Sequence, residues 1–111
     1  MSNSEMNESE EQNNGRQEIH AVAQAILAGT THPIDGIRLL SSLRYKIGQE
    51  DSEVFYLIVA LDSDSDTFPR GDFRDECSPA YLVRKDKEMD EFVSLYLNDL
   101  HKACREILDS I

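Results

Sequence analysis

Three aspartates alternate with serines at residues 62–66, in the stretch DSDSD. Carboxylates at positions i, i+2 and i+4 open a calcium-binding loop of the EF-hand kind. The rest of such a loop is missing, because its sixth position should be glycine and is Thr67, and its twelfth should be a bidentate glutamate and is Phe73. We therefore predict no metal ligands and no cofactor. A divalent-cation-binding protein that uses the loop from Asp62 to Asp66 stays open as an alternative.

The surrounding segment, residues 62–76, is rich in carboxylates and also contains Pro69 and Gly71, which is typical of an ordered loop. Asp and Ser side chains in such loops accept hydrogen bonds from backbone N–H groups, and the two arginines of the segment could pair with its aspartates. On this structural interpretation, the loop is organised by Asp62, Asp66, Arg70 and Arg74. On a functional interpretation, exposed carboxylates and a tyrosine bind a basic partner through Asp64, Asp72, Asp75, Glu76 and Tyr81.

Tyrosine side chains beside an acidic rim would be good interface anchors, because they combine a large apolar ring with a polar group. Tyr45 and Tyr81 are expected to be exposed. Tyr56 and Tyr96 have apolar neighbours and are expected in the core.

The histidines and cysteines show no catalytic arrangement. His20, His32 and His101 fall on separate predicted elements, so no two of them share a helical face. Cys104 lies on an apolar stripe, where a buried thiol is inert. We therefore predict no catalytic residues and no enzymatic activity.

The chain has 111 residues and a formal net charge of −11, which indicates one domain with a strongly acidic surface. Excess carboxylates repel nucleic acid and anionic membranes and attract basic partners over a long range. No apolar run approaches the roughly 18 residues that a membrane span requires. Two cysteines outside any paired motif and an N-terminus without an apolar signal segment indicate a cytoplasmic protein.

The elements that must position these residues are helices. Residues 1–15 have few apolar side chains and are expected to form a disordered acidic tail, followed by a single helical domain at 16–111. Apolar residues at helical spacing predict a helix over 16–28, which Gly29 would end. A second helix would begin at Thr31, close to Pro33, and end at Gly48.

Residues 54–61 (VFYLIVAL) could form a strand or a helix. Their β-branched and aromatic content is typical of a buried strand, but no second strand-like run exists with which it could pair. We therefore predict a third helix. Ser78 and Pro79 then begin the clearest amphipathic helix, in which a change of phase near Asp86 indicates a break. The prediction is an all-α bundle of four to five helices, or an α+β fold if 54–61 is a strand.

The acidic segment resembles a motif of a small bacterial family of unknown function. The shared positions are DSDSD at 62–66, Phe68-Pro69, Gly71, Arg74, Ser78-Pro79, Leu82 and Lys85-Asp86, with Gly36, Arg38, Leu40 and Leu43 upstream. The resemblance covers about residues 20–108, and Asp64 and Ser65 stand where the family has glutamate and threonine. It implies no activity or ligand, but it implies that Asp62 and Asp66 belong to the common design of the fold.

Small size, acidity and the absence of a catalytic motif favour a non-catalytic binding protein. The leading hypothesis is an immunity protein that binds and neutralises a cognate basic bacterial toxin domain, for example a nuclease, because an acidic inhibitor complements a basic toxin electrostatically. The alternatives are a housekeeping adaptor or regulatory domain, and the divalent-cation-binding protein considered above.

Overall fold

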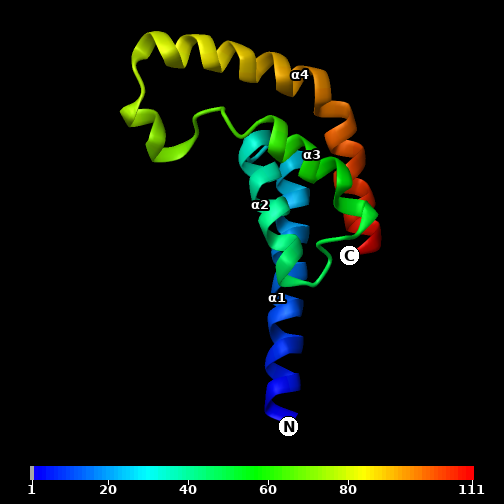
Figure 1. The fold of residues 1–111 in the computed structure, drawn as a ribbon. Coiled ribbons are helices and arrows are strands. Elements are labelled where there is room, and N and C mark those ends of the chain that lie inside the picture. Colours follow the sequence, from blue (N-terminus) through cyan, green and yellow to red (C-terminus); the bar gives the residue numbers. More distant parts are fainter. Residues whose placement is uncertain (1) are drawn as a thin grey trace.

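Helices α1 (Ser2–Ala28) and α2 (Pro33–Lys46) form an antiparallel hairpin in the computed structural model, which describes the backbone of residues 2–111 and the side chains of residues 10–111 (Figure 1). Gly29 ends α1 in the left-handed conformation, with φ of 74°, and the Thr30 N–H donates to the Ala25 carbonyl at 3.0 Å. Glycine adopts this conformation without the steric cost that a Cβ would add. Gly48, with φ of 68°, follows α2 in the same way, as predicted.

The residue that caps α2 is His32 rather than the expected Thr31. The N–H of Ile34 donates to His32 Nδ1 at 3.1 Å, and Pro33 occupies the first turn. Asp35 also lies in the first turn, where the positive end of the helix dipole favours a carboxylate.

The helix predicted over 16–28 is longer than expected, since α1 begins at Ser2 and so includes most of the segment 1–15 for which the sequence predicted a disordered acidic tail. Once residues 16–28 are held helical by packing, each added residue needs no new nucleation. Residues 10–14 are exposed, and Gly15 is the first buried position within residues 10–111. A Cβ at Gly15 would lie 2.8 Å from Ile47 Cγ2. Among residues 10–111, α1 is therefore packed against the bundle from Gly15 onward, beside the predicted domain boundary, which itself stays a prediction.

Residues 54–61 are helical, so the helix prediction is confirmed and the strand alternative is wrong. A short 3₁₀ helix η1 (Glu53–Phe55) leads into α3 (Tyr56–Asp64), and no strand occurs among residues 2–111. Phe55, Ile58 and Leu61 are buried. Tyr56 is 61% exposed, contrary to expectation, because it begins α3 on the side turned away from these three residues.

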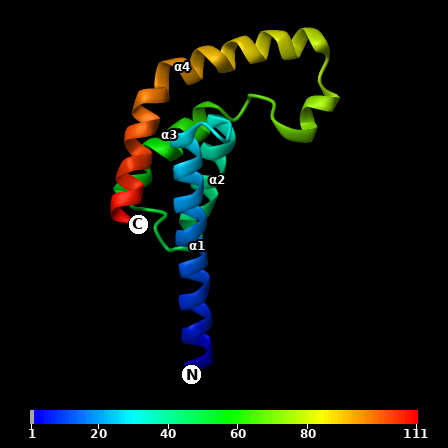
Figure 2. The ribbon, with the colours of Figure 1, turned by 180° about the vertical axis from the view of Figure 1, so that it is seen from behind.

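The last elements are the 3₁₀ helix η2 (Gly71–Glu76) and the long helix α4 (Pro79–Ser110). Ser78 caps α4 as predicted, its hydroxyl accepting from the Tyr81 N–H at 3.2 Å. The break expected near Asp86 does not occur. The first part of α4, residues 79–88, arches over the bundle (Figures 1 and 2). None of these residues belongs to the hydrophobic core, so their apolar side chains need not stay in phase with those that follow.

One hydrophobic core joins all four α-helices, and the predicted all-α fold is confirmed. The C-terminal part of α4 runs beside α3 and α1, and contributes Leu100, Ala103, Cys104 and Ile107. The molecule is elongated, with extents of 56 × 29 × 24 Å, because α1 projects from the bundle at one end and the first part of α4 arches over it at the other. None of the helices described is both long and apolar enough to cross a membrane.

Candidate functional site

The acidic segment 62–76 is divided among three pieces of structure. Asp62 and Asp64 lie in the last turn of α3, residues 65–70 form an irregular connection, and Asp72, Asp75 and Glu76 belong to η2. Carboxylates in the last turn of a helix oppose its dipole. The end of α3 therefore needs stabilisation from elsewhere in the fold.

Arg38 of α2 provides that stabilisation. Its Nη2 donates to the carbonyls of Ser65 and Phe68, both at 2.9 Å. Ser65 is completely buried, and a buried carbonyl without a donor would be costly. Arg38 was not among the site residues predicted from the sequence, although it belongs to the motif that suggested the family resemblance.

Arg70 turns toward the start of α2. Its Nε and Nη2 donate to the two carboxylate oxygens of Asp35 at 2.9 and 2.8 Å. This bidentate pair lowers the pKa of Asp35 and raises the pKa of Arg70. The expectation that Arg70 would pair with an aspartate of its own segment is wrong, because the two-pronged guanidinium fits Asp35, 35 residues earlier in the chain.

Arg74 makes a second bidentate pair, with Asp86 of α4. Nη1 and Nη2 each donate to a carboxylate oxygen at 2.8 Å, and Nη1 also donates to the Pro69 carbonyl at 3.2 Å. The hydrogen bonds to Arg74 lower the pKa of Asp86. This pair joins η2 to the arch of α4, and again the partner lies outside the acidic segment.

The consequence is a separation of charge, since both cations of the segment are paired with carboxylates of α2 and α4, whereas five of its own six carboxylates are exposed. Asp64, Asp66, Asp72, Asp75 and Glu76 are all exposed. None of them belongs to an ion pair among the side chains described. We call these five residues the outward carboxylates.

Of the four residues predicted to organise the loop, only the two arginines form side-chain contacts with the rest of the fold. Arg70 and Arg74 are tied into the fold, as described above. The carboxylates of Asp62 and Asp66 form no hydrogen bond to any described residue, and Asp62 takes part only through its backbone carbonyl, which accepts from Ser65 Oγ at 3.4 Å.

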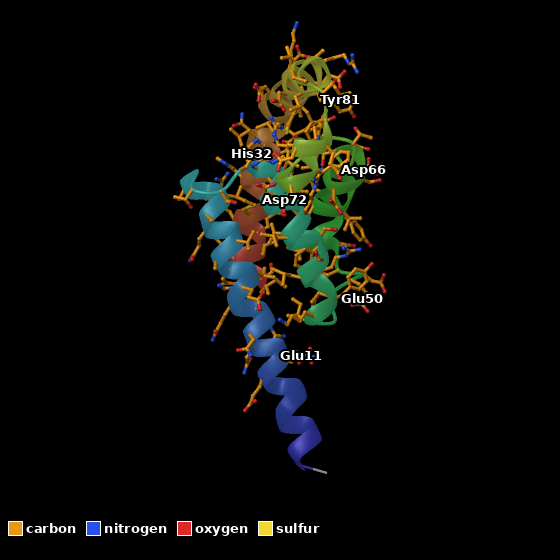
Figure 3. The ribbon with its side chains drawn as sticks, turned by 90° about the vertical axis from the view of Figure 1, so that its left-hand side faces the viewer. Glu11, His32, Glu50, Asp66, Asp72 and Tyr81 are labelled. Atoms are coloured by element: carbon orange, nitrogen blue, oxygen red, sulfur yellow. The ribbon has the colours of Figure 1, made fainter. Side chains whose placement is uncertain are left out.

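Tyr81, the fifth predicted binding residue, is half-buried near the start of α4. The guanidinium of Arg84 lies 5.3 Å and the Nζ of Lys85 lies 5.9 Å from the centre of its ring. Figure 3 shows Asp66, Asp72 and Tyr81 on separate parts of the upper molecule rather than around one point. The predicted residues therefore form a broad surface and not a pocket.

The chemistry available at this surface is that of exposed carboxylates. Within residues 10–111, no three His, Cys, Asp or Glu side chains come together as metal ligands would. The hydrogen bonds of the same region include no hydroxyl or thiol donated to a histidine or carboxylate. Burial raises the pKa of the Cys104 thiol to about 11, which leaves it protonated and unreactive.

A second acidic region escaped the sequence reasoning. Glu50, Asp51 and Glu53 lie exposed between α2 and α3, next to the exposed Tyr56. In Figure 3, Glu50 and Asp66 project from the same edge of the molecule at different heights. The signal in the sequence is three carboxylates within the four residues 50–53, a shorter acidic run than residues 62–76.

Comparison of the chain with models of protein families, with curated proteins and with solved structures finds no match. The family resemblance noted from the motif therefore remains an expectation.

Proposed function

We propose that this protein is a non-catalytic, acidic binding protein of the immunity type, which neutralises a basic bacterial toxin domain of the nuclease class by occupying its cationic surface. The observation that carries the proposal is the separation of charge in residues 62–76. Because Arg70 and Arg74 pair with Asp35 and Asp86, none of the outward carboxylates is in an ion pair among the described side chains, which leaves them free to bind a partner.

Such a surface favours rapid capture. Complementary potentials raise the association rate constant well above that of an uncharged pair, and the gain falls as salt screens the charges. The net charge of −11 extends this field over the whole molecule. A nuclease domain that binds the phosphates of nucleic acid through lysine and arginine would present the complementary surface.

The test begins with affinity capture of the tagged full chain from cells of its own species, with identification of the bound proteins by mass spectrometry. The captured protein is then produced alone and together with this chain. We expect a basic protein that stops growth when expressed alone and is harmless when co-expressed. A partner without toxicity, or one whose toxicity persists on co-expression, would overturn the proposal.

A charge-reversal variant tests the surface itself. In D64K/D72K/E76K we expect the association rate constant with the captured partner to fall by about tenfold or more at low salt and by less at physiological salt. The matched control is E10K/E11K/E91K, which reverses three exposed carboxylates on α1 and α4. Equal effects of the two variants in stopped-flow experiments would show that total charge matters and that these outward carboxylates do not.

A further inference from the structure

A groove lies on a different part of the molecule, between the start of α3 and the C-terminal half of α4. Its volume is about 250 Å³. Figures 1 and 2 show η1 and the start of α3 next to the C-terminal part of α4, with α3 slanting away from it. None of the outward carboxylates lines this groove, so it is independent of residues 62–76.

The groove has an apolar floor and an acidic rim. The floor consists of Val54, Leu57 and Ala103, and the rim carries Glu53, Asp99 and Glu106. Positions 99, 103 and 106 follow the i, i+4, i+7 spacing of one helical face, which brings rim and floor together. All three rim carboxylates are exposed.

The rim is not neutralised by the fold. Within the described part of the chain, none of these three carboxylates forms an ion pair. The only cation in the lining is Lys102, so three carboxylates face one ammonium group. Among the described residues, no three His, Cys, Asp or Glu side chains come together as metal ligands would, and the groove suits a larger, organic cation.

The chemistry of the groove matches a long basic side chain. Lysine and arginine place an aliphatic stem along apolar surface while the charged end remains among polar groups. Two large exposed apolar residues lie within one helical turn of lining residues along the chain. Leu95 precedes Asp99 by one turn of α4 and is 71% exposed, and Tyr56 follows Glu53 by three residues and is 61% exposed. A peptide segment with apolar residues beside its cation would cover both.

We infer that this groove is a docking surface for an arginine or lysine side chain of a protein partner, with neighbouring apolar side chains of that partner resting on Leu95 and Tyr56. The inference rests on the proposed function for the existence of a basic partner. It adds a defined anchor point that is separate from the outward carboxylates, which act over a longer range.

The test is an NMR titration of the full chain with the blocked pentapeptide ALRLA at low salt. We expect saturable shifts of the backbone amides around Glu53, Leu57, Asp99 and Glu106. The peptide in which citrulline replaces arginine keeps the shape but loses the charge, and should bind at least about threefold more weakly. Equal binding of the two peptides, or shifts concentrated in residues 62–76, would overturn the inference.

Charge-neutralising variants of the groove should either weaken or strengthen binding of the arginine peptide, depending on the charge removed. E53Q/E106Q should weaken binding of the arginine peptide by about three- to tenfold, as expected of exposed ion pairs. K102Q should strengthen it, because it removes the competing cation. The control E10Q/E11Q makes the same change in net charge on the exposed part of α1 and should bind as wild type does. If E53Q/E106Q behaves like this control, the groove is not the site.

The same variants distinguish this inference from the proposed function. If a toxin is captured but binds wild type and E53Q/E106Q equally, the groove inference fails and the proposed function stands. If the peptide occupies the groove but no toxin is captured, the proposed function fails and the groove remains a site for basic peptides.

Discussion

His32 shows how a single side chain can make the fold sensitive to pH. Its Nδ1 accepts the N–H of Ile34 and so must be unprotonated in the folded chain. Burial lowers the pKa of His32, and the nearby guanidinium of Arg70 lowers it further, whereas Asp35 and Asp90 act in the opposite direction. Arg74 adds to the positive field, and His101 of α4 lines the same pocket.

We predict that acidification destabilises the protein through His32. Because the folded pKa lies below the unfolded value of 6.5, the stabilisation is complete above pH 6.5 and is lost as the pH falls through the folded pKa. The matched variant is H32N, since asparagine caps a helix without titrating. Urea unfolding between pH 7.5 and 5 should show the free energy of unfolding of wild type falling relative to H32N. Parallel curves would contradict the role of His32.

At the residue scale, the sequence predicted that two arginines would form ion pairs, but not with which carboxylates. It identified Arg70 and Arg74 as parts of the scaffold, but their carboxylates lie 35 and 12 residues away in the chain. No local pattern carries such a pairing, because it depends on how α2, η2 and α4 meet. Tyr56 was misplaced for a related reason, since an unbroken apolar run gives no phase from which to tell the buried face from the exposed one.

At the scale of elements, the α1–α2 hairpin depends on a close approach at Gly36. A Cβ at this position would lie 2.5 Å from Ile26 Cγ1 and 2.6 Å from Ile26 Cδ1. Gly36 and Ile26 are both buried, so the isoleucine has little room to move. Glycine is therefore retained inside a helix despite its low helical propensity.

We predict that G36A is destabilising even though alanine is the better helix former. Propensity favours alanine by about 1 kcal/mol, whereas overpacking of a core costs about 1–3 kcal/mol. The free energy of unfolding in urea should therefore fall by about 1 kcal/mol. In the double variant I26A/G36A the shorter side chain makes room for the new methyl group, and the loss should be smaller than the sum of the two single losses. Strict additivity would refute the close approach as the cause.

Element types were largely predictable, and element lengths were not. Glycines at 29 and 48 and the Ser78-Pro79 pair marked helix ends correctly, because caps are local chemistry. The continuity of α4 through Asp86 was missed, since the arch has no core to impose a phase on its apolar residues. The extension of α1 to Ser2 was missed because amphipathic periodicity, from which its start was judged, is absent there.

At the scale of the whole molecule, charge and stability act against each other. A net charge of −11 makes the folded chain repel itself, and compact states feel this repulsion most. Four of the outward carboxylates also lie at the negative ends of helix dipoles, which disfavour them. Asp64 is the last residue of α3 and Asp66 follows it in the next turn, while Asp75 and Glu76 are the last two residues of η2. Arg38 stabilises the end of α3 through the Ser65 and Phe68 carbonyls, but none of these four carboxylates forms an ion pair among the described residues, as expected of a surface that binds a partner.

We therefore predict that D64N/D66N/D75N/E76Q unfolds at a higher urea concentration than wild type in 10 mM salt. Raising the salt to 150 mM shortens the Debye length from about 30 Å to about 8 Å, so it should stabilise wild type more than the variant. The single variant D72N should show no such gain, because Asp72 lies in the first turn of η2, where the dipole favours a carboxylate. If the quadruple variant is instead less stable than wild type at both salt concentrations, these carboxylates organise the fold. The binding surface would then have to be sought at the groove between α3 and α4.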